Sequence, residues 1–163
     1  MTFMGSLLDK QTEIRNMLDV RSNIVIGFDS ALIVVFVTYF HDTLMTNWAG
    51  WLALGTLLAS LLCAIIALKP PHYQSKKGQK ESLFYHHYIE SKTLQEYKAE
   101  IHQVLKNKNQ IFDAYIQEIY NLTNYSNIPR KLYLYLSIRI LLYGLIISVI
   151  AYGLTVLWSI LVK

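Results

Sequence analysis

The stretch RSNIVIGFDSALIVVFVTYF, residues 21–40, decides the fold class of this chain. From Ile24 to Phe40 every residue except Asp29 is at home in hydrocarbon. A hydrocarbon layer about 30 Å thick requires roughly 20 mainly apolar residues in helical form. The stretch therefore predicts a membrane-spanning helix, and the carboxylate inside it predicts that Asp29 has either a partner or a task.

Two further stretches are long and apolar enough to cross a membrane. They are WAGWLALGTLLASLLCAIIAL at residues 48–68 and YLYLSIRILLYGLIISVIAYGLTVLWSIL at residues 133–161. The composition agrees, because 53% of the 163 residues are hydrophobic, 16% are charged and the mean hydropathy is +0.29. These values lie outside the usual range of soluble domains. The single cysteine, Cys63, excludes a disulfide framework within one chain.

Basic residues are concentrated between the second and third spans. Residues 69–132 contain ten Lys and Arg against six Asp and Glu, whereas HDTLMTN at residues 41–47 contains no Lys or Arg. Cytoplasmic loops carry an excess of Lys and Arg, so this segment and the N-terminus are expected in the cytoplasm. In this setting the net charge of +4 marks the cytoplasmic face, and no nucleic acid polymer is expected as a partner.

Helical periodicity continues outside the three spans. Residues 1–21 predict a short amphipathic helix, and apolar residues at helical spacing in 94–105 and 111–122 predict two more helices that meet near KNKNQ, residues 106–110. Pro129 predicts a kink or a restart before the third span. The fold class is an all-α membrane protein with a cytosolic helical hairpin between its second and third transmembrane helices. The expected single domain, 1–163, consists of a cytosolic leading helix (1–21), a transmembrane hairpin (22–68), a cytosolic linker and helical hairpin (69–132) and a third transmembrane helix (133–162).

The third span also contains a charge, Arg139. Asp29 and Arg139 each lie six residues into their spans, at about 9 Å along the helix axis, and both helices run in the same direction. A charge in a membrane helix costs roughly 2.5 to 3.5 kcal/mol at the centre, and pairing relieves this cost. Three alternatives remain open: a pair within or between chains, snorkelling towards the interface, and a pore-lining or proton-carrying role.

Small residues recur with a spacing of four in the first two spans. The pairs are Gly27 with Ala31 and Gly55 with Ala59, and Ala49 with Ala53 follows the same spacing. Small residues allow membrane helices to approach closely. These positions are candidate packing surfaces, either between the three spans or between copies in a homo-oligomer.

Basic residues flank the second and third spans on the predicted cytoplasmic side. They are Lys76, Lys77, Lys80, Arg130 and Lys131. Basic groups near an anionic membrane surface gain about 1 kcal/mol each without a specific site. These residues are candidate contacts for lipid headgroups or for a phosphate-bearing ligand.

The sequence offers no constellation for catalysis or for metal binding. His86, His87 and Glu90 lie close together, but a zinc site needs three or four ligands, and adjacent helical side chains diverge by about 100°. There is no phosphate-cradling glycine loop and no activated nucleophile with a spaced base. We therefore expect neither an enzyme, nor a metal site, nor a permanently bound cofactor.

The order of these features resembles the transmembrane effector family of the Pycsar bacterial antiphage system. The resemblance covers about residues 8–152. It is carried by four stretches: DVRSNIVIGFDSALIVVF (19–36), ALKPP (67–71), LFYHHYIESKTLQEYKAEI (83–101) and YIQEIYNLTNYSNIPRKLYLYLSIRILLYGLIISVI (115–150).

This resemblance implies a multi-pass protein of the bacterial inner membrane, and the charge distribution places its N-terminus in the cytoplasm. The resemblance also implies that a partner cyclase makes a cyclic pyrimidine mononucleotide during phage infection, and that the effector then impairs the inner membrane and causes abortive infection. The chain shows no separate cyclic-nucleotide-binding barrel, so the nucleotide would be sensed by the cytosolic helices or by another protein. Two other functions fit the residues alone: a constitutive small channel or transporter subunit, and a membrane scaffold that docks a soluble partner through the cytosolic hairpin.

Overall fold

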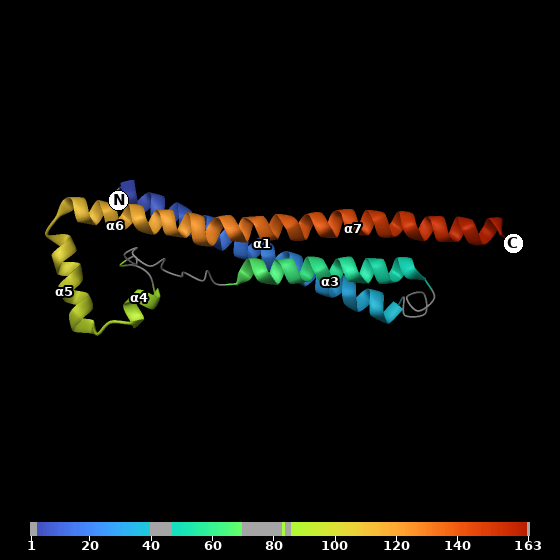
Figure 1. Ribbon diagram of the computed structural model, residues 1–163, viewed down its shortest axis with the longest axis horizontal. Helices are drawn as coiled ribbons and strands as arrows, with labels where there is room; N and C mark the ends of the chain where they lie inside the picture. Colours follow the sequence, from blue (N-terminus) through green and yellow to red (C-terminus); the bar gives the residue numbers. More distant parts are fainter. Residues whose placement is uncertain (1–2, 40–46, 70–82, 84–85, 163) are drawn as a thin grey trace, which may run out of the picture. The chain divides into compact units, whose positions relative to one another are not determined.

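The computed structural model describes residues 3–39, 47–69, 83 and 86–162 (Figure 1). All regular secondary structure in this part of the chain is helical. In chain order the elements are α1 (Phe3–Tyr39), α3 (Trp48–Leu68), α4 (His86–Glu90), α5 (Leu94–Leu105), α6 (Lys108–Asn121), the π-helical segment η1 (Leu122–Asn127) and α7 (Ile128–Leu161).

The chain divides into two compact units. Unit 1 comprises Met1–Asn16 and Pro70–Ile128, and unit 2 comprises Met17–Lys69 and Pro129–Lys163. The three predicted spans belong to helical runs that are long and apolar enough to cross a membrane: Phe3–Tyr39, Trp48–Leu68 and Lys108–Leu161. The prediction of three such helices is confirmed, and the second has the predicted bounds at both ends.

A short separate helix was predicted for residues 1–21. The structure shows no separate helix there. This segment is the first part of α1, which continues without a break for 37 residues. The physical reason is that no proline interrupts NMLDVRSNIVIG, so each added residue extends an existing hydrogen-bonded helix at little cost.

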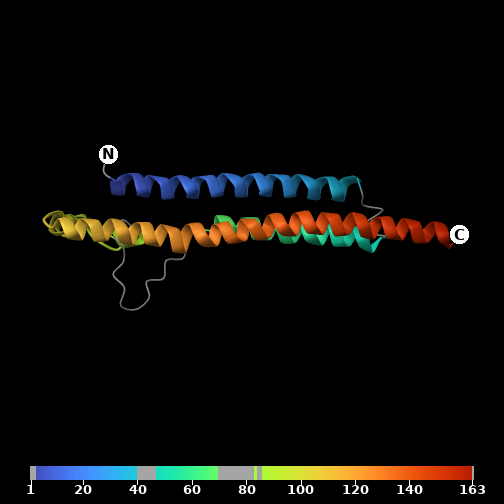
Figure 2. The same ribbon diagram turned by 90° about the horizontal axis from the view of Figure 1, so that it is seen from above.

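Helices α3 and α7 pack side by side and antiparallel in unit 2 (Figures 1 and 2). Asn47, the N-cap of α3, donates its amide hydrogen to the Thr155 hydroxyl at 3.2 Å near the C-terminal end of α7. Further along α3, Ser60 meets Ser137 in the first third of α7.

The seam between these two helices consists of small, polar and leucine side chains. The buried residues are Ala49, Ala53, Leu57, Ser60, Ala64 and Ala67 on α3, with Leu134, Ser137, Leu141, Gly144, Ser148 and Ala151 on α7. The steps of three and four residues, which alternate along α7 and nearly so along α3, correspond to a heptad seam, in which two helices stay in contact by supercoiling. Small residues in this seam let the backbones approach closely, as in membrane helix pairs.

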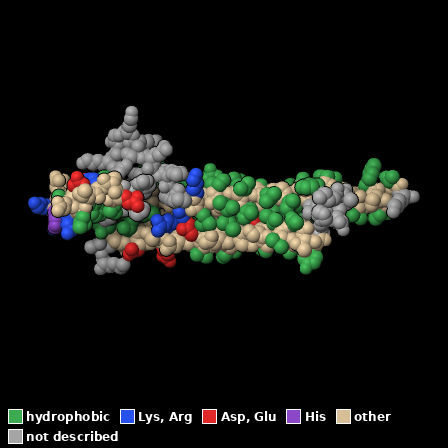
Figure 3. Space-filling view, turned by 90° about the horizontal axis from the view of Figure 1, so that it is seen from below, with side chains coloured by type: hydrophobic (Ala, Val, Ile, Leu, Met, Phe, Trp, Pro, Cys, Tyr) green, Lys and Arg blue, Asp and Glu red, His purple; other side chains and the backbone are tan. Residues whose placement is uncertain are grey.

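The outer face of unit 2 has the opposite composition. Large apolar side chains are exposed there, for example Leu62 at 60% and Val149 at 71%, and Figure 3 shows hydrophobic side chains covering the visible face of this unit. A monomer surrounded by water rarely exposes so continuous an apolar surface. Lipid is the solvent that matches this surface.

The third span does not restart at Pro129. The helical run from Lys108 to Leu161 is unbroken, and η1 lies immediately before α7. In η1 the backbone hydrogen bonds reach one residue further than in an α-helix, as in the bond from the Ile128 N–H to the Thr123 carbonyl. This change of register accommodates Pro129, which has no N–H to donate. The predicted kink or restart is therefore a local π-helical turn.

Two helices meet where the sequence predicts a turn. Helix α5 begins with a capping box, in which the Glu96 N–H is bonded to the Thr93 side chain and the Glu96 carboxylate to the Thr93 N–H. Helix α6 begins after Asn107, whose side chain accepts from the Asn109 N–H at 3.0 Å. Figure 1 shows α5 turned across the end of α6 rather than folded back along it, so the predicted helical hairpin is not confirmed.

Candidate functional site in the transmembrane core

Ser60 and Ser137 form the centre of the seam between α3 and α7. The Ser60 hydroxyl lies 3.1 Å from the Ser137 carbonyl oxygen, and the Ser137 hydroxyl lies 2.9 Å from the Ser60 carbonyl oxygen. The two hydroxyl oxygens are 3.0 Å apart. Both residues are fully buried. A polar contact of this kind ties membrane helices together because hydrocarbon offers no competing hydrogen bonds.

Asp29 of α1 is buried beside this serine pair. Its exposed fraction is 0%, and the Ser60 side chain lies close to its carboxyl group. Among the described residues neither carboxylate oxygen of Asp29 has a hydrogen-bond partner, because the hydroxyl of Ser60 is directed to Ser137. A buried carboxylate without a partner is costly and is most often retained for function.

Arg139 lies at nearly the same depth as Asp29 but points elsewhere. It follows Ser137 by two residues, which rotates its side chain by about 200° around the helix. Since Ser137 faces the bundle interior, Arg139 is exposed on the outer face of α7. The structure therefore does not bring Asp29 and Arg139 together within one chain. A pair between chains, and snorkelling of Arg139, both stay predictions.

The ion pair in unit 2 joins α1 and α7 at a different place. The Arg130 guanidinium donates to the Asp19 carboxylate, and the Arg130 side chain is only 10% exposed. The prediction was that Arg130 is a free contact for lipid or phosphate. The structure does not support it, because Arg130 is buried and paired with Asp19. Lys131 is exposed, with its ammonium 5.7 Å from the centre of the Tyr135 ring.

Other predicted contacts fall where the structure makes no statement. Lys76, Lys77 and Lys80 lie outside the described residues, as do the side chains of His86 and His87. In the part of the chain that is described, no group of three or more His, Cys, Asp or Glu residues could hold a metal ion.

Of the predicted small-residue pairs, Ala49 and Ala53 are buried in the seam, and the other two pairs are not. Gly27, Ala31 and Gly55 are exposed, and Ala59 is half-buried. The close approach occurs instead at Gly144, where an added Cβ would lie 2.5 Å from the Thr56 Cβ. The spacing of four therefore found one pair of the seam, and a role of the other positions in contacts between copies stays a prediction. The signal that could have found the seam is the alternation of three and four among Ala, Ser and Gly residues.

A second set of buried polar groups surrounds η1 in unit 1. The Asn127 amide donates to the Gln11 side-chain oxygen at 3.0 Å and to the Gln11 carbonyl at 3.2 Å. Among the described residues, the Asn121 side-chain amide nitrogen and the Ser126 hydroxyl have no hydrogen-bond partner. π-Helical turns often occur at functional sites, and unpaired buried groups make the present conformation costly.

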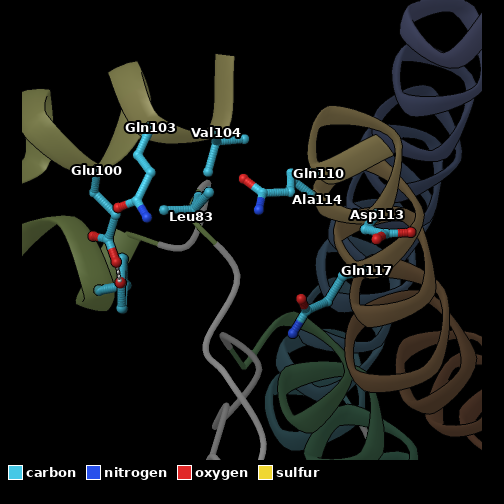
Figure 4. Close-up of a pocket in the computed structure, with 9 residues that line it drawn as sticks. Leu83, Glu100, Gln103, Val104, Gln110, Asp113, Ala114 and Gln117 are labelled. Carbon is cyan, nitrogen blue, oxygen red and sulfur yellow. Dashed lines mark hydrogen bonds between the residues drawn. The ribbon is translucent and has the colours of Figure 1, made fainter. Parts of the chain in front are cut away.

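Unit 1 also contains an open pocket of about 440 Å³ (Figure 4). It is lined by Leu83, Tyr88, Glu100, Gln103, Val104, Gln110, Asp113, Ala114 and Gln117. These residues include two carboxylic acids and three carboxamides, and no Lys or Arg is among them. The lining does not favour an anion such as a nucleotide phosphate.

A polar triad connects α4 to α5 beside this pocket. Tyr88 donates to the Glu100 carboxylate at 2.7 Å, and the Lys92 ammonium contacts both the Glu100 carboxylate and the Tyr88 hydroxyl. The hydrogen bond to Glu100 raises the pKa of Lys92, and burial raises the pKa of Tyr88. Lys92 is therefore held as a cation that already has its counter-charge.

Three long apolar helical runs, an interior of small and polar residues and an outer surface of large apolar ones define a helical integral membrane protein. A family model described as the Pycsar effector protein domain, PycTM, matches residues 6–157. The chain belongs to the Pycsar transmembrane effector family and is a membrane effector of antiphage defence. No match was found among curated proteins or among solved structures.

Proposed function

We propose that this protein impairs the bacterial inner membrane in response to a cyclic pyrimidine mononucleotide, and that the cell is thereby lost before the phage matures. The observation that carries the proposal is the family match over residues 6–157, which includes α3 and most of the other two long apolar helical runs. The family implies that a partner cyclase makes the signal. The family and the helical architecture both suggest a non-enzymatic effector.

The proposed topology places the N-terminus and residues 69–132 in the cytoplasm. It is supported by the excess of Lys and Arg in that segment. We propose Lys76, Lys77, Lys80 and Lys131 as the contacts for a nucleotide phosphate or for lipid headgroups. Arg130 is left out because it is paired with Asp19, and the pocket of unit 1 is left out because carboxylic acids line it.

The proposed route from signal to membrane is the helical run from α6 through η1 into α7. A ligand shifts a conformational equilibrium only by the difference between its affinities for the two states. A π-helical turn contains one residue more than the corresponding α-helical turn, so moving that residue rotates the following helix by about 100°. Such a rotation of α7 would separate Ser137 from Ser60 and open the seam beside Asp29.

The proposed active form is a homo-oligomer. Gly27, Ala31 and Gly55 present small exposed surfaces, and an added Cβ at either glycine would meet nothing within 4 Å in the single chain. Small exposed residues allow close contact with a second copy. Arg139 on the outer face of α7 would also find a counter-charge more readily in an oligomer than in lipid.

The test is a measurement of membrane potential in growing bacteria that express the full chain. A voltage-sensitive dye is followed with and without a co-expressed cyclase that makes a cyclic pyrimidine mononucleotide, and a purine cyclase is the matched control. We expect depolarisation only with the pyrimidine cyclase. An unchanged potential in all three cultures, with the effector present in the membrane fraction, would refute the proposal. Depolarisation without any cyclase would indicate a constitutive channel instead.

A further inference from the structure

The carboxyl group of Asp29 requires neutralisation that no described hydrogen bond supplies. It is fully buried in unit 2, and neither of its oxygens has a partner among the described residues. An ionised carboxylate in so apolar a site has only three remedies: a basic side chain, a metal cation or a proton.

The basic side chains of unit 2 that the structure describes are either exposed, as Lys69 is, or paired with another residue. Arg130 is paired with Asp19, and Arg139 is exposed on the far side of α7. Arg21 is exposed on α1 and precedes Asp29 by eight residues, about 12 Å along the helix. Helix α3 contains no charged residue, and its single titratable side chain is Cys63. On α7 the remaining titratable groups are Lys131 and tyrosines, and these are exposed at the positions nearest to Ser137.

The oxygen atoms around Asp29 are too few and too occupied for a metal cation. Hard metal cations collect roughly six oxygen ligands. The polar side chain that is placed beside Asp29 among the described residues is Ser60, and it is already bonded to Ser137. A proton needs only one carboxylate oxygen, and the resulting O–H donates to a neighbouring hydroxyl oxygen, which retains a free lone pair.

We propose that Asp29 is a proton-binding site and that its side chain is a neutral carboxylic acid in the closed bundle at neutral pH. One proton from water adds to one carboxylate oxygen, and Ser60 is the acceptor of the new O–H. The site is built from all three spans, because Asp29 lies on α1, Ser60 on α3 and Ser137 on α7. If the bundle opens to water, a step that rests on the proposed function, the acid releases its proton and leaves a fixed negative charge in the opening.

The test is infrared spectroscopy of the purified full chain in lipid, without any nucleotide. At pH 8 we expect a carbonyl stretch of a protonated carboxylic acid, since every other Asp and Glu among the described residues is at least partly exposed. Asp29→Asn should lose this band, and Asp19→Asn should keep it. The spectrum of the wild-type protein alone decides the question if Asp29→Asn does not fold, because a pH 8 spectrum without the band overturns the proposal.

A second measurement separates a proton from a metal cation. Thermal unfolding of the wild-type protein is followed in sodium chloride, potassium chloride and choline chloride at equal ionic strength. We expect the same midpoint in all three salts. A midpoint that rises with sodium or potassium in the wild-type protein but not in Asp29→Asn would overturn the assignment in favour of a metal site. Neither measurement depends on nucleotide gating, so failure here leaves the proposed function standing.

Discussion

Unit 1 and unit 2 hold their helices together in opposite ways. Helix α5 of unit 1 buries none of its residues completely and depends on its capping box and on the contacts of Lys92 and Glu100. Helix α3 of unit 2 buries alanines, a serine and a leucine, and exposes large side chains such as Leu62. The solvent explains this difference, because water rewards burial of large apolar groups, whereas lipid rewards close backbone approach and paired polar groups.

The comparison teaches which contacts carry energy in each unit. In unit 2 the decisive contacts are those that let two backbones approach or that satisfy a buried polar group. In unit 1 they are local hydrogen bonds at the ends of helices, which water weakens. We therefore expect enlarging a small side chain to lower the stability of unit 2 strongly, and removing a hydrogen bond at a helix end to lower the stability of unit 1 only slightly.

The largest effect is expected from Gly144→Leu in the seam of unit 2. The first added carbon would lie 2.5 Å from the Thr56 Cβ, so α3 and α7 must separate. Overpacking of this kind costs typically 1–3 kcal/mol, and we expect about 3 kcal/mol here. The measurement is unfolding of the purified protein in mixed micelles. Gly153→Leu on the same helix is the matched control, because its Cβ would meet nothing within 4 Å. Equal losses in both variants would show that close approach does not hold this unit together.

A smaller effect is expected when the pair of Asp19 with Arg130 is broken. Asp19→Leu leaves a guanidinium that is 10% exposed without its counter-charge, and the Nε of Arg130 already has no described partner. Because the Asp19 side chain is 34% exposed, we expect a loss of about 2 kcal/mol, below the 3–5 kcal/mol of fully buried pairs. Unfolding in micelles measures the loss. The exchanged pair, Asp19→Arg with Arg130→Asp, should recover part of the lost stability. Replacing the exposed Lys131 with an uncharged side chain should leave the stability unchanged.

The smallest effect is a pH dependence at the start of α5 in unit 1. Hydrogen bonds from the Thr93 N–H and hydroxyl lower the pKa of Glu96 below its usual value near 4.5. The ionised form is therefore favoured by folding, so its stabilisation is complete above pH 4.5 and is lost as the pH falls through the lower value of the folded state.

Protection of the first-turn amides of α5 from hydrogen exchange should decrease in that acidic range. Glu96→Gln keeps an acceptor for the Thr93 N–H but cannot titrate, so it should remove the pH dependence while leaving the cap in place. An unchanged pH dependence in this variant would assign the effect to another group.

Much of the architecture follows from the sequence because membrane helices are determined locally. The bounds of α3 coincide with the apolar run at residues 48–68, since hydrocarbon requires every backbone hydrogen bond to be made within the segment. The turn between α5 and α6 was predicted from helical periodicity and falls within residues 106–110. Asp29 was selected as the residue that needs an explanation, and the structure places it in the core.

The errors concern direction rather than depth. Arg139 was compared with Asp29 by its position along the helix, and its direction around the helix was left out. Gly27 and Gly55 were selected by spacing alone, whereas the close contact is at Gly144. The π-helical turn before Pro129 was expected to be a kink, because sequence patterns show that a hydrogen bond is missing but not how the neighbouring turn adapts.

By itself the sequence determined how many helices are long and apolar enough to cross a membrane, the bounds of the second of them, and that the first contains a carboxylate. Length and apolarity suffice for this, because each helix satisfies its own backbone. Only the tertiary structure decided which face of each helix points inward, and hence that Asp29 adjoins Ser60 while Arg139 faces out. In lipid both faces of a helix are apolar, so the inward face is chosen by the shape and hydrogen bonding of its neighbours, which no single segment contains.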